Sequence, residues 1–138
     1  MALNLSPAFA QDNFPDVPDN HWAYEVLEVW MDHGVKTTLK KPGHLIGARP
    51  ISRVQFALST VEIVDQLDEL LRLDLKRVTP GKNPVEANFF GHDIWVWFNR
   101  MTKVFGPEIK GLGRDPKKLR AQAFKSKPMA LKLAGLYK

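Results

Sequence analysis

Apolar residues recur at the three- and four-residue spacing of a helical face in three stretches of the chain. The first predicted helix covers about residues 20–33. Asp19 or Asn20 is its expected N-cap, and Gly34 favours its C-terminal end. The apolar face consists of Trp22, Ala23, Val26, Leu27 and Trp30.

The second predicted helix begins in the segment SRVQ, where Ser52 and Gln55 have the spacing of a capping box. It continues to about Val78, and the turn-forming sequence TPGKNP at 79–84 ends it. The apolar face consists of Phe56, Thr60, Ile63, Val64, Leu67, Leu70 and Leu71. A solvated opposite face is expected from Glu62, Asp65, Asp68, Glu69 and Arg72.

The third stretch follows Asp93, its expected N-cap, and stops at Gly106 and Pro107. Its apolar face consists of Ile94, Trp97, Phe98, Met101, Val104 and Phe105. Asp115 and Pro116 then predict the start of a basic helix near 117–125. Strand-like alternation appears only over 35–39. The pattern therefore predicts an all-α fold, a small helical bundle.

Charge is unevenly distributed along the 138 residues, whose net charge is +5. Residues 114–138 hold eight of the 20 Lys and Arg but only one of the 15 Asp and Glu, so the rest of the chain is slightly acidic. The high pI therefore belongs to the C-terminal tail and by itself does not predict nucleic-acid binding. The absence of cysteine excludes disulfides and thiolate metal sites.

Two separated motifs, FPDVPDNHWAYEVLEVWMDHGV at 14–35 and GHLIGARPISRVQFA at 43–57, together resemble the S-layer homology family. The first motif, from Phe14, matches the family's Phe-x-Asp-Val, His-Trp-Ala and helix-ending Gly. The second motif, from Gly43, matches its loop and the Ile-Thr-Arg-Ala-Glu-Phe-Ala opening of its second helix. The likeness covers about 14–66. Pro42, Gly47 and Gln55 depart from the pattern.

The resemblance implies non-covalent binding of an anionic, often pyruvylated, cell-wall polysaccharide or peptidoglycan, and so an anchoring role. The family's contact to the acidic sugar carries over onto Arg53, whose guanidinium can form two parallel hydrogen bonds with a carboxylate. Asp16, Trp22 and Gly43 are further motif positions expected at the glycan site. For Trp22, core packing and sugar stacking both remain open. No cofactor is expected.

The organisation that follows is an export-signal remnant or disordered segment at 1–11, an S-layer-like module at 12–78, an aromatic-rich helix and turn at 79–113, and a basic helical tail at 114–138. The SPAFAQD segment resembles a secretory cleavage site. A single module resembles those at the N-termini of cyanobacterial and other diderm envelope proteins. The expected location is therefore the cell envelope, where a homotrimer or an envelope-protein partner supplies neighbouring surfaces.

No catalytic or metal-binding pattern appears in the sequence. The histidines lack the spacing of metal ligands, and the carboxylates of the predicted helices are expected on solvated faces. We therefore expect a non-enzymatic protein that binds no metal and no nucleic acid. Trp95 and Trp97 cannot both be buried by one helix face, which leaves either a partner-binding surface or a second core layer. The basic tail either binds an anionic surface or is a solvated helix with a frayed end. The alternative function is a structural subunit of a membrane-associated complex, docking through these tryptophans and the tail.

Overall fold

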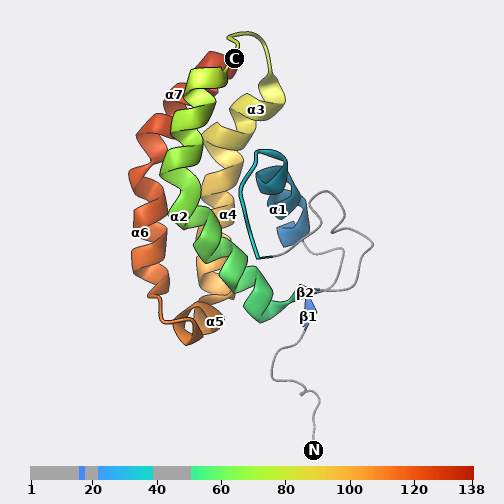
Figure 1. Ribbon diagram of the computed structural model, residues 1–138, viewed down its shortest axis with the longest axis vertical. Helices are drawn as coiled ribbons and strands as arrows, with labels where there is room; N and C mark the ends of the chain where they lie inside the picture. The colour runs from blue at the N-terminus through green and yellow to red at the C-terminus, as the bar shows by residue number, and fades with distance from the viewer. Residues whose placement is uncertain (1–15, 18–21, 39–50) are drawn as a thin grey trace, which may run out of the picture.

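The computed structural model describes residues 16–17, 22–38 and 51–138, and almost all of the regular structure there is helical (Figure 1). The elements are β1 (Asp16–Val17), α1 (Trp22–Asp32), β2 (Ile51–Ser52), α2 (Arg53–Arg77), α3 (Pro84–Asn88), the π-helical turn η1 (Phe89–Asp93), α4 (Ile94–Val104), α5 (Gly106–Gly111), α6 (Pro116–Lys125) and α7 (Lys127–Tyr137). The predicted all-α fold class is confirmed.

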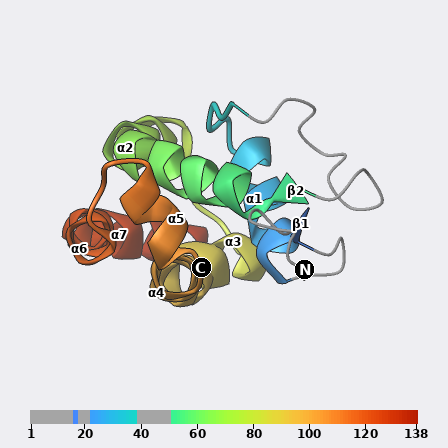
Figure 2. The same cartoon turned by 90° about the horizontal axis from the view of Figure 1, so that it is seen from below.

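Three helical columns form the body of the protein. Helix α2 runs in one direction, α3, η1 and α4 return as a second column, and α6 followed by α7 runs alongside α2 (Figure 1). Helix α5 crosses the end where the second column passes into the third. Helix α1 packs against α4 on the side away from α6 (Figure 2).

Helix α1 ends as the sequence predicts. Gly34 has a φ of 90°, a left-handed conformation that glycine adopts without steric cost. Its N–H donates to the carbonyl of Met31, and the N–H of Val35 donates to the carbonyl of Trp30. These two bonds and the buried Val35 side chain form a Schellman motif, which satisfies carbonyls that the helix end leaves free. The predicted caps at 19–20 lie outside the described residues.

The strand-like segment after α1 is not a strand over residues 35–38. Its backbone instead bonds to side chains of α2. Gln66 accepts from the N–H of Lys36 and donates to the carbonyl of the same residue. Glu62 accepts from the backbone N–H of Thr38 at 2.9 Å and from its hydroxyl at 2.6 Å. Glu62, expected on a solvated face, therefore fastens this segment to the bundle.

Helix α2 confirms the predicted capping box and apolar face. The Ser52 hydroxyl accepts from the N–H of Gln55 at 3.2 Å, and the Gln55 side chain accepts from the N–H of Ser52 at 3.0 Å. Both bonds satisfy amides that the first turn leaves without an intrahelical partner. The seven residues predicted for the apolar face are all buried.

The second column begins earlier than predicted. Asn83 caps it by accepting from the N–H of Glu86, and Pro84 occupies the first turn, where no backbone donor is needed. The predicted cap, Asp93, instead has helical backbone angles and makes no capping bond. Its carboxylate accepts from the Asn88 side-chain amide at 3.0 Å. A second cap signal ten residues upstream therefore outweighs the one at Asp93.

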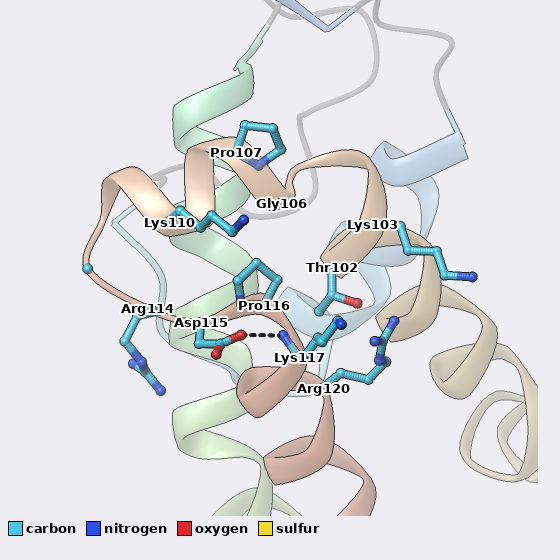
Figure 3. Close-up of a pocket in the computed structure, with 11 residues that line it drawn as sticks. Thr102, Lys103, Gly106, Pro107, Lys110, Arg114, Asp115, Pro116, Lys117 and Arg120 are labelled. Atoms are coloured by element: carbon cyan, nitrogen blue, oxygen red, sulfur yellow. Dashed lines mark hydrogen bonds between the residues drawn. The ribbon is translucent and has the colours of Figure 1, made fainter.

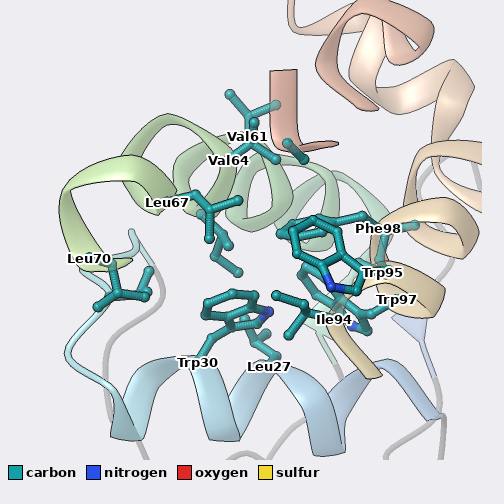
Figure 4. Packing of buried hydrophobic residues seen from close by; sticks show 14 of the residues in the cluster. Leu27, Trp30, Val61, Val64, Leu67, Leu70, Ile94, Trp95, Trp97 and Phe98 are labelled. Atoms are coloured by element: carbon teal, nitrogen blue, oxygen red, sulfur yellow. The ribbon is translucent and has the colours of Figure 1, made fainter. Parts of the chain in front are cut away.

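One hydrophobic cluster joins α1, α2, the second column and both C-terminal helices. Its centre is aromatic (Figure 4). The Trp30 ring lies 5.2 Å from Phe89, 5.7 Å from Phe98 and 6.2 Å from Trp97, measured between centroids. These tilted and edge-on arrangements are the ones that aromatic quadrupoles favour.

The tail after residue 114 packs against this core and is not a frayed end. Helix α6 begins as predicted, with the Asp115 side chain accepting from the N–H of Lys117 and Pro116 at the first position. Helix α7 lies in the second half of the predicted basic helical tail, where the sequence pattern gave no separate bounds for it. It buries Ala130, Leu133 and Ala134 against the bundle. Of the two alternatives for the tail, the solvated helix with a frayed end is therefore wrong, and binding to an anionic surface stays a prediction.

Candidate functional site

The two motifs of the sequence resemblance lie side by side. Strand β1 pairs antiparallel with β2, with Asp16 opposite Ser52 and Val17 opposite Ile51. These residues are about 35 positions apart, and the ladder brings the start of the first motif next to the part of the second motif that opens α2. Arg53 follows β2 directly and is the first residue of α2. Gly43 lies outside the described residues, and so does the side chain of Trp22.

The guanidinium of Arg53 is already engaged by the chain itself. Its Nε donates to Oε2 of Glu108 at 3.0 Å, and Nη2 donates to Oε1 of the same carboxylate at 3.3 Å. Nη2 also donates to the backbone carbonyl of Val104. The guanidinium carbon lies 4.7 Å from the ring centroid of Phe105, a cation–π distance.

This arrangement fixes the direction in which Arg53 points and ties α5 to the start of α2. The side chains of Arg53 and Glu108 are 27% and 14% exposed, so the pair sits at the edge of the core with part of the cation in solvent. The two parallel bonds to Glu108 are the bonds that a sugar carboxylate would make. A ligand carboxylate must therefore replace Glu108 or bind Nη1, which has no hydrogen-bond acceptor among the described residues.

Trp95 and Trp97 do not form an exposed surface. Trp97 is 1% exposed and Trp95 is 6% exposed. The Trp95 indole N–H donates to the carbonyl of Phe90 at 2.9 Å, and its ring lies 5.3 Å from that of Phe124 in α6. The expectation of an outward Trp95 is wrong because α6 covers the side of α4 that the helix alone leaves open. The second of the two alternatives, another core layer, is the observed one.

Sequence reasoning missed a charged cluster at the opposite end of α2. His33 at the end of α1 has Nε2 2.8 Å from Oε2 of Glu86 and Nδ1 3.4 Å from Oδ2 of Asp74. Arg77 donates to the other oxygen of Asp74 at 2.8 Å. The His33 ring stacks on Phe89, with 5.6 Å between centroids. No local pattern marks this cluster, because its members come from three helices.

The environment shifts the pKa of both central groups. Burial lowers the pKa of His33, but its bond to Asp74 and the charges of Glu86 and Asp74 outweigh burial and raise it above the ordinary value. Burial raises the pKa of Asp74, but the bonds from His33 and Arg77 outweigh it and leave this pKa below the ordinary value. The cluster thus favours a charged imidazolium between carboxylates.

Comparisons with family models, with curated proteins and with solved structures find no match for this chain. Within the described residues, no helix is both long and apolar enough to cross a membrane, and no group of three or more His, Asp and Glu is arranged to hold a metal ion. The arguments about function below therefore rest on the chain's own residues and on the motif resemblance.

Proposed function

We propose that this protein is an exported, non-catalytic binding module that attaches non-covalently to an anionic, carboxylate-bearing glycan of the cell envelope. The observation that carries the proposal is the pairing of β1 with β2. This ladder joins two motifs that the sequence separates by a loop, and it sets Arg53 at the opening of α2 beside them.

The contacts of Arg53 suit an exchange of carboxylates. Phe105 and the Val104 carbonyl hold the guanidinium in one orientation, so little side-chain entropy is lost when a ligand binds. A sugar carboxylate that takes the place of Glu108 restores the same two hydrogen bonds and the same pair of charges. Glu108 is then a built-in competitor, and the affinity for the glycan is the difference between two similar interactions.

The experiment is co-sedimentation of purified protein with cell-wall sacculi, with and without chemical removal of pyruvyl groups. Arg53→Gln removes the guanidinium that forms two parallel hydrogen bonds with a carboxylate. It is expected to weaken glycan binding about 10-fold or more, since a charge-assisted hydrogen bond contributes about 1.5–3 kcal/mol. Glu108→Gln removes the competitor and is expected to hold or tighten binding. Arg72→Gln, on the exposed face of the same helix with only Asp68 as its ion-pair partner among the described residues, is the matched control.

The two variants at the site break the same internal ion pair, so a loss of stability alone would affect both in the same direction. Opposite effects on sedimentation separate a ligand contact from a structural role. Circular dichroism melting of each variant verifies that the fold persists. Equal sedimentation of wild type and Arg53→Gln contradicts the assignment of Arg53.

A further inference from the structure

We propose that a cationic cleft between α4, α5 and α6 is a second anion-binding site, which receives the carboxylates or phosphates of the same polyanionic glycan. The cleft has a volume of about 820 Å³ and is lined by residues of these three helices and of the loop 113–115. The proposal rests on the proposed function for the identity of the polymer. The site lies outside both motifs of the sequence resemblance.

Lysines on successive elements surround the cleft. Lys103 comes from the last turn of α4, Lys110 from α5 and Lys117 from the first turn of α6, and all three are exposed. Arg120 follows one turn after Lys117. Figure 3 shows Lys110, Lys117 and Arg120 around the space between α5 and the start of α6. The chain turn between the helices therefore gathers cations that the sequence spreads over 18 positions.

The charges of these lysines are not neutralised by the protein. Among the described residues, none of the three makes a salt bridge, in contrast to Arg53 and Arg114, whose guanidinium groups bind Glu108 and Asp65. The one acidic residue in the lining, Asp115, directs a carboxylate oxygen to the backbone N–H of Lys117. The cleft thus has an excess of positive charge that an anionic ligand can satisfy.

The walls of the cleft are held from behind. Ile109 and Leu119 are fully or almost fully buried and fix α5 and α6 to the core. Arg114 makes two bonds to Asp65 of α2, at 3.0 and 3.1 Å, and so anchors the connecting loop. Gly113 has a φ of 84° and allows the sharp turn between the two helices. The helices therefore hold the lysines at fixed positions in the backbone, an arrangement that suits binding to repeated charges along a polymer.

The lining favours a hydrated polysaccharide over a nucleic acid or a membrane. Within the described part of the chain, no aromatic side chain lines the cleft, whereas proteins that bind single-stranded nucleic acid commonly stack bases on aromatic rings. Membrane binding requires a continuous apolar face beside the cations. The large exposed apolar residues of the described chain are instead scattered over several helices, at Leu73, Val85, Val96, Val104, Leu112 and Leu131.

The test is isothermal titration of the full chain with polygalacturonate as the carboxylate probe, polyphosphate as the phosphate probe and dextran as the neutral control. Lys110→Gln/Lys117→Gln is compared with Lys76→Gln/Lys132→Gln, which removes two charges at exposed positions outside the cleft. We expect wild type to bind a polyanion and not dextran. The cleft pair should lose about 10-fold in affinity and flatten the dependence on salt, because fewer counterions are released. The control pair should lose less than 3-fold.

Equal losses in the two pairs would show a general effect of net charge and overturn the cleft site. Tighter binding to a 20-nucleotide single-stranded DNA, or to vesicles of one part phosphatidylglycerol and three parts phosphatidylcholine, would overturn the glycan assignment. The ratio of affinities for polygalacturonate and polyphosphate identifies the anionic group.

Sacculus co-sedimentation of the same variants separates this proposal from the proposed function. If wild type and the cleft pair sediment equally well, the cleft is not a glycan site and the anchoring function stands. If wild type does not sediment, the anchoring function fails, and the assignment of an envelope glycan to the cleft fails with it. Sedimentation that falls selectively for the cleft pair supports both.

Discussion

Two charged regions lie at opposite ends of the bundle, one where α1, α2 and α7 finish and the other around α5 (Figure 1). At the first, His33 lies between the carboxylates of Asp74 and Glu86, and Arg77 pairs with the other oxygen of Asp74. At the second, the Arg53–Glu108 pair is closed, but the lysines around the neighbouring cleft are not paired within the described residues. The ion pairs at the first end hold helices together, whereas the unpaired lysines at the second end carry the anion site that we propose.

The difference follows from burial. The Asp74 side chain is 8% exposed, so its negative charge needs partners inside the protein. Lys110 and Lys117 are exposed to water and form no ion pair with the residues that the structure describes. Removing a charge at the first end should therefore reduce stability, whereas removing a charge from the cleft should reduce binding. The predictions below follow this division from the largest expected effect on stability to the smallest.

The largest effect is expected for Asp74→Asn. The substitution leaves Arg77 and a partly buried His33 with less negative charge nearby, and we expect a loss of about 2 kcal/mol in the free energy of unfolding at pH 6. Urea denaturation provides the measurement. Asp68→Asn is the control, because Asp68 is 58% exposed and pairs only with Arg72 among the described residues. A loss of the same size in both variants would remove the contrast between the buried and the exposed carboxylate.

A smaller effect is expected from pH. The raised pKa of His33 means that its contribution to stability is complete below its ordinary pKa of 6.5 and is lost as pH rises through the folded-state value. The lowered pKa of Asp74 means that its contribution is present above 3.8 and is lost as pH falls through its folded-state value. Stability should therefore be highest between these limits. Arg77 and Tyr137 also face the cluster, and burial raises the pKa of the Tyr137 hydroxyl above its ordinary value, so this hydroxyl stays neutral across the window.

Thermal melts from pH 3 to 9 check this prediction. His33→Gln removes the group that loses its proton as pH rises. The decline in melting temperature above pH 6.5 should therefore become shallower in that variant, while the decline at low pH should remain. His92→Gln is the matched control, since the His92 side chain is 69% exposed. An unchanged alkaline decline in His33→Gln would assign that decline to another group.

Glu108→Gln should reduce stability by about 1 kcal/mol, because the pair with Arg53 lies at the edge of the core and solvent screens part of it. The Val104 carbonyl and the Phe105 ring continue to hold the guanidinium. Differential scanning calorimetry gives the change. A much larger loss would show that this pair is as structural as the Asp74 cluster, which would weaken its role as an exchangeable ligand contact.

The smallest effect is expected for Lys110→Gln/Lys117→Gln, within about 0.5 kcal/mol of wild type, as for surface substitutions without specific partners. Urea denaturation at low and high salt checks it. Mutual repulsion of the lysines implies that any shift at low salt is stabilising and shrinks as salt is added. A substantial destabilisation would mean that these lysines hold the helices in place.

Much of the local structure is predictable from the sequence. Ser52 and Gln55 fix the start of α2, Gly34 fixes the end of α1, and Asp115 with Pro116 starts α6. Each of these depends on bonds within a few residues of the chain. The start of the second column was mispredicted because two cap signals compete, at Asn83 and Asp93, and local pattern does not decide between them.

The candidate site is less predictable. The resemblance singles out Arg53, but its partner Glu108 is 55 positions away and belongs to a helix with no distinguishing pattern. The cationic cleft is visible in the sequence only as an excess of basic residues after residue 114, which omits Lys103 and Lys110. Helical periodicity predicts no neighbour that covers Trp95, because this pattern describes one helix and not the helices that pack against it.

The sequence by itself determined the helical class, the ends of the longer helices and the apolar faces, because capping bonds and the 3.6-residue period act over a few positions. Only the tertiary structure decided which charges meet: Arg53 with Glu108, His33 with Asp74 and Glu86, and three lysines with no partner among the described residues. Electrostatic energy depends on distance through space and on access to water. Neither quantity is defined until the helices have packed.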